Sequence, residues 1–251
     1  AFTHNLTTLF HVVCQGVYSK MRKLGLIGGM SWVSTASYYK RINSTVQKRL
    51  GGFSSAHMLI ESVNFSEYAR LQSDDDWDAA AGLMTRSAKR LENSGATAVL
   101  ICSNAMHKIY DQVQPEVGIP IIHIADCVGD KMVADGIKSA TLLGSRNVMT
   151  EGFYRKRLVG KGITLSPPDE ERVEEIDRII YEELMFSIVK RDSERTMKTY
   201  ITNIAKGDVE AIVLGSTELD LVIDTKANIL PIYDSTEIHS NAAVDGIVSD
   251  D

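Results

Sequence analysis

The sequence of 251 residues has few of the features that mark several large classes of protein. Three cysteines (Cys14, Cys102 and Cys127) are too few for a disulfide framework and indicate a reducing compartment. The net charge is -6 and no Lys/Arg cluster is present, which argues against nucleic acid as a partner. No apolar run reaches the length of a membrane span, which argues against a membrane. These absences predict a soluble protein of the cytoplasm.

Signatures of cofactor and metal sites are missing as well. The pair Gly28–Gly29 follows an apolar run, but the G-x-G-x-x-G spacing of a dinucleotide loop is absent. The histidines are scattered without short-range pairing, so no metal site is expected. His123 is predicted to be a core histidine in a strand, and the acidic run at 74–78 is predicted to be a solvated helix start. We therefore expect neither a cofactor nor a metal.

The chain contains an internal repeat. Residues 24–42 are echoed at 141–158, with Gly29 and Gly144, Thr35 and Thr150, and Tyr39 and Tyr154 each separated by 115 positions. The run at 98–107 is echoed at 212–221, which aligns Cys102 with Ser216, and the run at 119–126 is echoed at 229–236. Two copies of one α/β unit are therefore predicted to pack about a pseudo-twofold axis, with equivalent loops facing one cleft.

Short apolar runs alternate with longer amphipathic stretches. Strands are predicted at 23–28, 57–63, 97–102, 119–125, 140–144, 163–167, 210–215 and 229–234. Helices are predicted at 77–95, which ends on Gly95, and at 170–190, which begins with acidic residues. This alternation indicates an α/β fold with mostly parallel sheets, in which ligands bind beyond the carboxyl ends of strands. Four such ends should point toward one site, at Met30, Cys102, Ser145 and Ser216.

The predicted organisation has three parts. Residues 1–20 form an extension without acidic residues, residues 21–127 form the first α/β half, and residues 128–251 form the second. The final segment, 235–250, is expected to be a helix that packs back on the first half.

Cys102 and Ser216 are the leading candidates for chemistry. A thiolate at the end of a strand can act as a nucleophile or a general base, although free cysteines are also common in cores. Ser216 lies in G-S-T-E, where Thr217 and Glu218 add a hydroxyl and a carboxylate, but no G-x-S-x-G elbow surrounds it. Cys127 is predicted to be a core residue, and Cys14 lies in the extension.

An ordered set of motifs resembles one family. G-G-M-S-W at 28–32, C-S-N-A-M-H-K at 102–108, I-Y-E-E-L at 180–184 and G-S-T-E-L at 215–219 are similar to the cofactor-independent aspartate/glutamate racemases. The resemblance extends from about Met21 to the C-terminus. It implies two flavodoxin-like halves with the active site between them, a small dicarboxylic amino acid as substrate, and a homodimer. It also implies two-base chemistry, in which one thiolate removes the α-proton and an opposing thiol protonates the other face.

The resemblance assigns roles to individual residues. Cys102 and Ser216 take the two catalytic positions, and Asn104 and Thr217 are suitable donors to the substrate carboxylate. Ser54 and His57 fall where relatives place contacts to the substrate side chain. With Met30, Ala105 and Glu218 they complete the predicted binding set.

Two departures from the family pattern bear on activity. Ser216 stands where the second cysteine belongs, and a hydroxyl is a far weaker acid than a thiol, so two-way racemisation should be impaired. We favour an introduced Cys→Ser change as the explanation over a natural one-cysteine relative. Ala105 stands where the family often has threonine. Two other functions remain open: a ligand-binding pseudoenzyme, and a single-cysteine decarboxylase or isomerase acting on dicarboxylates.

Overall fold

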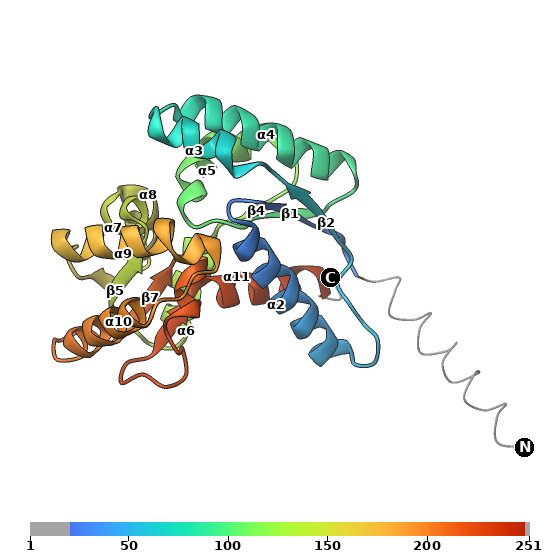
Figure 1. Ribbon diagram of the computed structural model, residues 1–251. Helices are drawn as coiled ribbons and strands as arrows, with labels where there is room; N and C mark the ends of the chain where they lie inside the picture. Colours follow the sequence, from blue (N-terminus) through green and yellow to red (C-terminus); the bar gives the residue numbers. More distant parts are fainter. Residues whose placement is uncertain (1–20, 249–251) are drawn as a thin grey trace, which may run out of the picture.

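Two parallel β-sheets of four strands each organise the computed structural model, which describes residues 21–248 (Figure 1). The first sheet has the strand order β2-β1-β3-β4, and the second has the order β6-β5-β7-β8. Every neighbouring pair is parallel. Both halves thus have the order of the first four strands of a flavodoxin-like sheet. The repeat that is visible in the sequence is therefore also a repeat of topology.

Within residues 21–248, the strands lie where the apolar runs predict them. They are β1 (Leu24–Gly28), β2 (Met58–Ser62), β3 (Ala98–Ile101), β4 (Ile121–Ile122), β5 (Ser139–Gly144), β6 (Thr164–Leu165), β7 (Ala211–Gly215) and β8 (Ile232–Asp234). The central strands β1 and β7 are buried along their whole length. Uninterrupted apolar runs of this kind are expected where both faces of a parallel sheet are covered.

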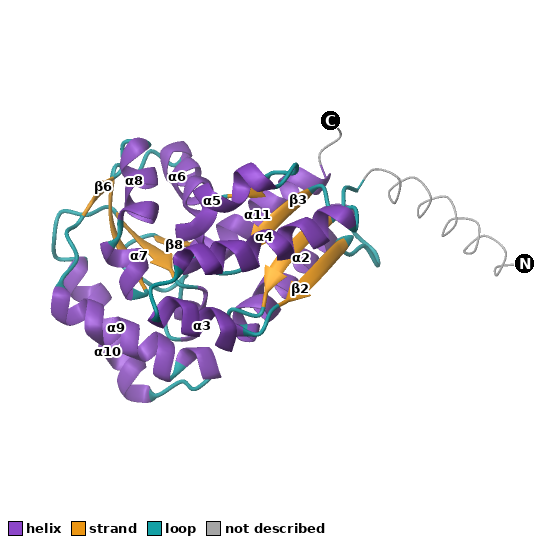
Figure 2. Ribbon diagram, turned by 90° about the horizontal axis from the view of Figure 1, so that it is seen from above, coloured by secondary structure: helices purple, strands orange, loops and turns teal. Residues whose placement is uncertain are grey.

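Helices cover both faces of each sheet (Figures 1 and 2). On the first sheet, α3 (Phe65–Ser73) and α4 (Trp77–Asn93) cover one face, and α2 (Trp32–Leu50) and α11 (Ser235–Val248) cover the other. On the second sheet, the two faces are covered by α6 (Ile124–Ala134) with α8 (Gly152–Gly160), and by α9 (Glu170–Glu182) with α10 (Arg191–Ile204). The shorter elements are η1 (Ala105–Ile109), α5 (Tyr110–Val113), η2 (Gln114–Glu116), α7 (Arg146–Thr150), η3 (Leu184–Phe186) and η4 (Thr217–Leu221).

The last helix, α11, crosses from the second half to the first. Its buried residues Ala243, Val244 and Ile247 join Leu24 and Leu26 of β1 in one apolar cluster. The C-terminal segment, expected as a helix over 235–250, thus lies against the first sheet. The expected boundary at 127/128 falls inside α6, whose buried side chains belong to the core of the second half.

Two local predictions need correction. The helix expected over 170–190 ends at Glu182, because Glu183 leaves the helical conformation and Ser187 is left-handed. His123 is buried as expected, but it is not in a strand. It is the N-cap of α6, and its Nδ1 accepts a hydrogen bond from the backbone of Ala125.

The extension predicted at 1–20, which includes Cys14, lies outside the described residues. Among the helices within 21–248, none combines the length and the apolar character needed to cross a membrane.

Candidate active site

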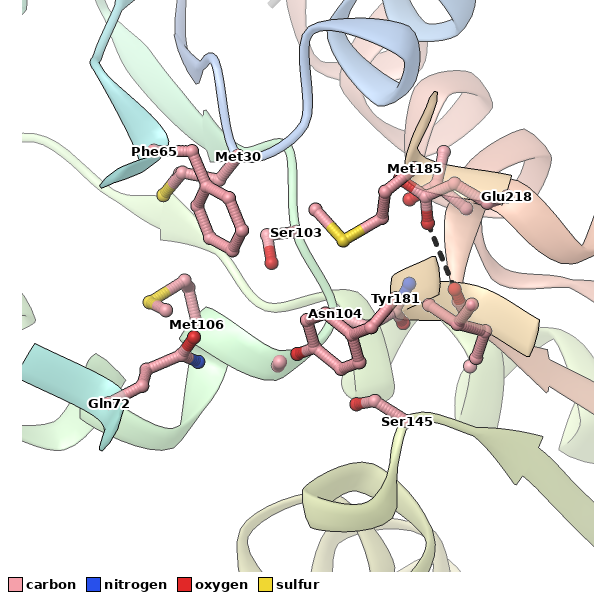
Figure 3. Close-up of a pocket in the computed structure, with 15 residues that line it drawn as sticks. Met30, Phe65, Gln72, Ser103, Asn104, Met106, Ser145, Tyr181, Met185 and Glu218 are labelled. Carbon is pink, nitrogen blue, oxygen red and sulfur yellow. Dashed lines mark hydrogen bonds between the residues drawn. The ribbon is translucent and has the colours of Figure 1, made fainter. Parts of the chain in front are cut away.

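A pocket lies where the carboxyl ends of strands from both halves meet. The end of β3 contributes Ser103, Asn104 and Ala105, and the end of β7 contributes Gly215, Ser216, Thr217 and Glu218. Met30 follows β1, and Ser145 follows β5. The remaining lining residues, from α3, η1, α9 and η3, are Phe65, Gln72, Met106, Ile180, Tyr181 and Met185 (Figure 3). Residues at the ends of four strands therefore meet at one pocket, but Cys102 is not among them.

Cys102 does not line this pocket. Its side chain is fully buried in the cluster that contains Leu24, Leu26 and Tyr38, on the face covered by α2 and α11. Successive side chains along an extended strand point to opposite sides, so Ser103 lines the pocket instead. Burial also raises the pKa of the Cys102 thiol well above its usual range, which disfavours a thiolate there. The structure therefore moves the candidate catalytic position of the first half from Cys102 to Ser103.

The strand registers explain this displacement by one residue. In the first sheet, Ile27 pairs with Ile101, and the ladder continues with a hydrogen bond of 2.9 Å from the backbone N of Cys102 to the backbone O of Ile27. In the second sheet, Gly144 pairs with Gly215. The last residues of β1 and β5 are Gly28 and Gly144. Continuing the first ladder by one residue places Cys102 beside Gly28, as Gly215 lies beside Gly144, so the next residues, Ser103 and Ser216, are equivalent. A shift of one residue along a strand moves each side chain to the opposite face of the sheet.

Ser216 belongs to a hydrogen-bond chain that joins the two halves. Its Oγ donates to Oε2 of Glu218 at 2.9 Å (dashed line in Figure 3), and Oγ of Ser31 donates to Oε1 of the same carboxylate at 2.7 Å. Burial raises the pKa of Glu218, while the two hydroxyl donors act in the opposite direction. A buried carboxylate that accepts the Ser216 proton can assist proton transfer through that hydroxyl.

The side chain of Asn104 is buried, and its amide lacks hydrogen-bond partners among the described residues. Asn104 is 4% exposed, and within the described residues neither Nδ2 nor Oδ1 has a hydrogen-bond partner. An unsatisfied buried polar group costs about 1–3 kcal/mol, so a ligand that pairs with this amide recovers that cost. The amide offers a donor and an acceptor side by side, which suits a ligand that carries both an anionic and a cationic group.

His107 holds the loop that carries Ser103, and sequence reasoning missed this role. Its Nδ1 donates to the backbone O of Ser103 at 2.8 Å, and its Nε2 accepts from the backbone N of Ile124 at 3.3 Å. Burial lowers the pKa of His107 to about 4, so the ring is neutral at pH 7 with its proton on Nδ1. The available signal was its position four residues after Ser103 in the C-S-N-A-M-H-K motif.

Ser54 and His57 are remote from the pocket. Both precede β2 and lie at the amino end of the first sheet, where the backbone O of His57 accepts from the backbone N of Leu24. The pocket lies at the opposite, carboxyl end of the strands. The structure therefore does not bring these two residues together with Met30, Asn104, Ala105, Thr217 and Glu218, which do line the pocket.

The α9–η3 segment forms one side of the pocket, and none of its residues was predicted to line the site. It contributes Ile180, Tyr181 and Met185, and burial raises the pKa of Tyr181 to about 12, which keeps its hydroxyl protonated. The I-Y-E-E-L motif at 180–184 was a usable signal for this wall. The cavity has a volume of about 30 Å³, enough for water molecules. Over residues 21–248, no group of three or more His, Cys, Asp and Glu side chains is arranged to hold a metal ion.

The chain belongs to the Asp/Glu/hydantoin racemase family, whose model matches residues 27–243. It is 24% identical over 226 residues to the broad specificity amino-acid racemase RacX of Bacillus subtilis, covering 88% of this chain and 96% of that protein. A Yersinia pestis protein assigned to the Asp/Glu racemases superimposes with a TM-score of 0.85 at 40% identity, covering 91% of this chain and all of that one. An aspartate racemase homologue from Pyrococcus horikoshii gives a TM-score of 0.78 at 32% identity, again over 91% of this chain and 100% of the other.

Proposed function

We propose that this chain binds a free α-amino acid in the pocket and racemises it slowly, with the α-carbon between Ser103 and Ser216. The observation that carries the proposal is that these two hydroxyls end equivalent strands of the two halves and line one pocket. Family membership and the amino-acid racemase name of the B. subtilis relative support an amino acid as substrate. The unpaired amide of Asn104 suits the head group, because it can donate to a carboxylate and accept from an ammonium.

The proton transfers follow from the hydrogen bonds around Ser216. In one direction, Oγ of Ser216 takes the α-proton while its own proton passes to Glu218, with which it shares a hydrogen bond of 2.9 Å. The Ser103 hydroxyl then donates a proton to the opposite face of the carbanion and regains a proton from water, and the hydroxide that this leaves takes the proton from Glu218. In the other direction the same steps run in reverse: Ser103 takes the α-proton while its own proton passes to hydroxide, and Ser216 protonates the opposite face and regains its proton from Glu218.

The reaction is expected to be slow. The unperturbed pKa of a thiol is about 8.5, and a hydroxyl is a much weaker acid. Both facing positions are serines, so the site lacks the thiol pair that the resemblance implies. A second candidate function, a binding protein without turnover, is favoured by the same observation. The expectations of a homodimer and a cytoplasmic location stay predictions, whereas the lining of the pocket argues against the dicarboxylic substrate that the resemblance implies.

Proton NMR in deuterated water tests the proposal. We expect slow loss of the α-proton signal from an added amino acid, reduced at least about tenfold in Ser216→Ala and in Ser103→Ala. Ser54→Ala serves as the matched control and should exchange at the parent rate. Binding without any exchange would establish the binding protein in place of the racemase. Exchange that neither pocket variant changes would remove the assignment of the two serines.

A further inference from the structure

We propose that this pocket selects neutral α-amino acids and discriminates against aspartate and glutamate. The inference rests on the proposed function, because it names the class of amino acid that the same pocket accepts. It is carried by the charge and the polarity of the side chains that surround the ligand position. Three features of the lining lead to it.

The first feature is the charge of the lining. Glu218 contributes a buried carboxyl group, and none of the fifteen described lining residues is Lys, Arg or His. The nearby cation in the C-S-N-A-M-H-K motif is engaged elsewhere, since Nζ of Lys108 lies 2.8 Å from Glu151 and 4.0 Å from the centroid of the Trp77 ring. A second carboxylate on the ligand would therefore be buried near Glu218 without a cationic partner. Burial of a charge in that setting is unfavourable.

The second feature is the side-chain amide of Asn104, which is buried and has no hydrogen-bond partner among the described residues. Asn104 has one donor group and one acceptor, which match one carboxylate and one ammonium group. These are the two charges of a zwitterionic amino acid with a neutral side chain. A dicarboxylic ligand brings a third charged group, and the remaining lining supplies only neutral donors for it.

The third feature is an adaptable apolar wall. Met30 after β1, Met106 on η1 and Met185 on η3 line the pocket, and Phe65 packs against the apolar cluster that contains Met30 and Met106 (Figure 3). Methionine side chains are unbranched and flexible, so they repack around ligands of different size. The cavity of about 30 Å³ is small, and rotation of these flexible side chains would enlarge it. The wall that makes room for the side chain is therefore apolar.

Calorimetric titration with three amino acids of nearly the same shape isolates the effect of charge. L-Methionine, L-glutamine and L-glutamate are titrated into the full chain at pH 7. We expect methionine and glutamine each to bind at least about tenfold more tightly than glutamate. Glutamate binding as tightly as methionine would overturn the inference while leaving the proposed function intact. If none of the three binds, the proposed function itself fails.

A variant with an added cation sharpens the comparison. Gln72 lines the pocket from α3, so Gln72→Lys places an ammonium group at the wall, and Gln72→Met is the matched neutral control. We expect Gln72→Lys to raise the affinity for glutamate relative to methionine by at least about tenfold, with no such change in Gln72→Met. An unchanged preference in Gln72→Lys, with methionine still bound, would show that charge does not set the selectivity.

Discussion

At the scale of single residues, the end of β3 presents two neighbouring side chains to opposite faces of the first sheet. Cys102 and Ser103 are neighbours, yet one is fully buried behind the first sheet and the other lines the pocket. Reactivity is what first draws attention to a cysteine, but a strand presents only alternate residues to one side. A thiol with a pKa raised by burial is a packing group here, and the pocket is left with hydroxyls.

Replacement of Cys102 distinguishes a packing role of its thiol from a catalytic role. Cys102→Ala is expected to lower the free energy of unfolding by roughly 1 kcal/mol, the order of burying one methylene-sized group. Its ligand affinity and its rate of α-proton exchange should equal those of the parent, because the side chain does not reach the pocket. Chemical denaturation and NMR exchange measure the two effects. Loss of exchange in a folded Cys102→Ala protein would restore Cys102 as the catalytic residue.

The pocket-lining residue at the end of β3 could be predicted from the sequence only to within one residue. The repeat indicates the strand end, but it aligns Cys102 with Ser216 and carries no information about the register between strands. The register that decides between Cys102 and Ser103 depends on hydrogen bonds between β1 and β3, which are not local. Thr217 and Glu218 were found because they directly follow the apolar run of β7. Ser54 and His57 were misplaced, because a resemblance in sequence carries no information about which end of a sheet they occupy.

At the scale of elements, apolar patterning was a sufficient guide to the strands. It overestimated the length of α9, because tertiary contacts end the helix early. The Glu183 carboxylate is buried and accepts hydrogen bonds from Oγ of Ser193 at 2.5 Å and from Nη1 of Arg178 at 2.8 Å. Those partners hold Glu183 out of the helical conformation. The resulting break leads into η3, which carries Met185 toward the pocket.

The docking of α11 on the first sheet makes a specific contribution to stability. Ile247 is 1% exposed and packs in the cluster that contains Leu24 and Val46. Ile247→Ala is expected to lower the free energy of unfolding by about 2–5 kcal/mol, the range for removal of a large core side chain. Exposed Val133→Ala is the control and should change stability by less than about 0.5 kcal/mol. Equal effects of the two variants in urea denaturation would show that α11 is not docked as described.

At the scale of the whole molecule, the two halves are held together by contacts around the pocket and by α11. Nη2 of Arg41 on α2 lies 2.7 Å from Asp220 and 2.8 Å from the buried Asp234, which belong to the second half. The Ser31–Glu218 hydrogen bond also crosses between the halves. The rings of His107, His123 and His239 form a further buried junction, with centroids 4.7 Å and 5.7 Å from that of His107.

The buried histidines predict loss of stability in acid. Burial lowers the pKa of His107 to about 4 and that of His239 to about 3, and it lowers the pKa of His123 as well. The unfolded state therefore binds more protons, so stability is lost as the pH falls below about 6.5 and decreases further toward pH 4. Each histidine contributes a slope of up to about 1.4 kcal/mol per pH unit. Glu218 and Asp234, whose pKa values are raised by burial, act in the opposite direction.

Thermal melts between pH 7.5 and pH 4.5 test this expectation. The midpoint should fall steadily below pH 6.5. The exposed His57 lies outside the cluster, and His57→Gln should reproduce the parent profile. A midpoint that stays constant or rises on acidification would contradict the placement of three neutral histidines at the junction.

The proposed reaction requires Ser103 and Ser216 to face the α-carbon of a bound amino acid from opposite walls. Its most direct test is α-proton exchange and inversion in deuterated water by the double variant Ser103→Cys/Ser216→Cys, followed by proton NMR beside the parent. Since thiols are much stronger acids than hydroxyls, the account predicts that exchange rises at least about tenfold and is accompanied by inversion of configuration. A double variant that folds and binds the amino acid, yet exchanges no faster than the parent, would contradict it.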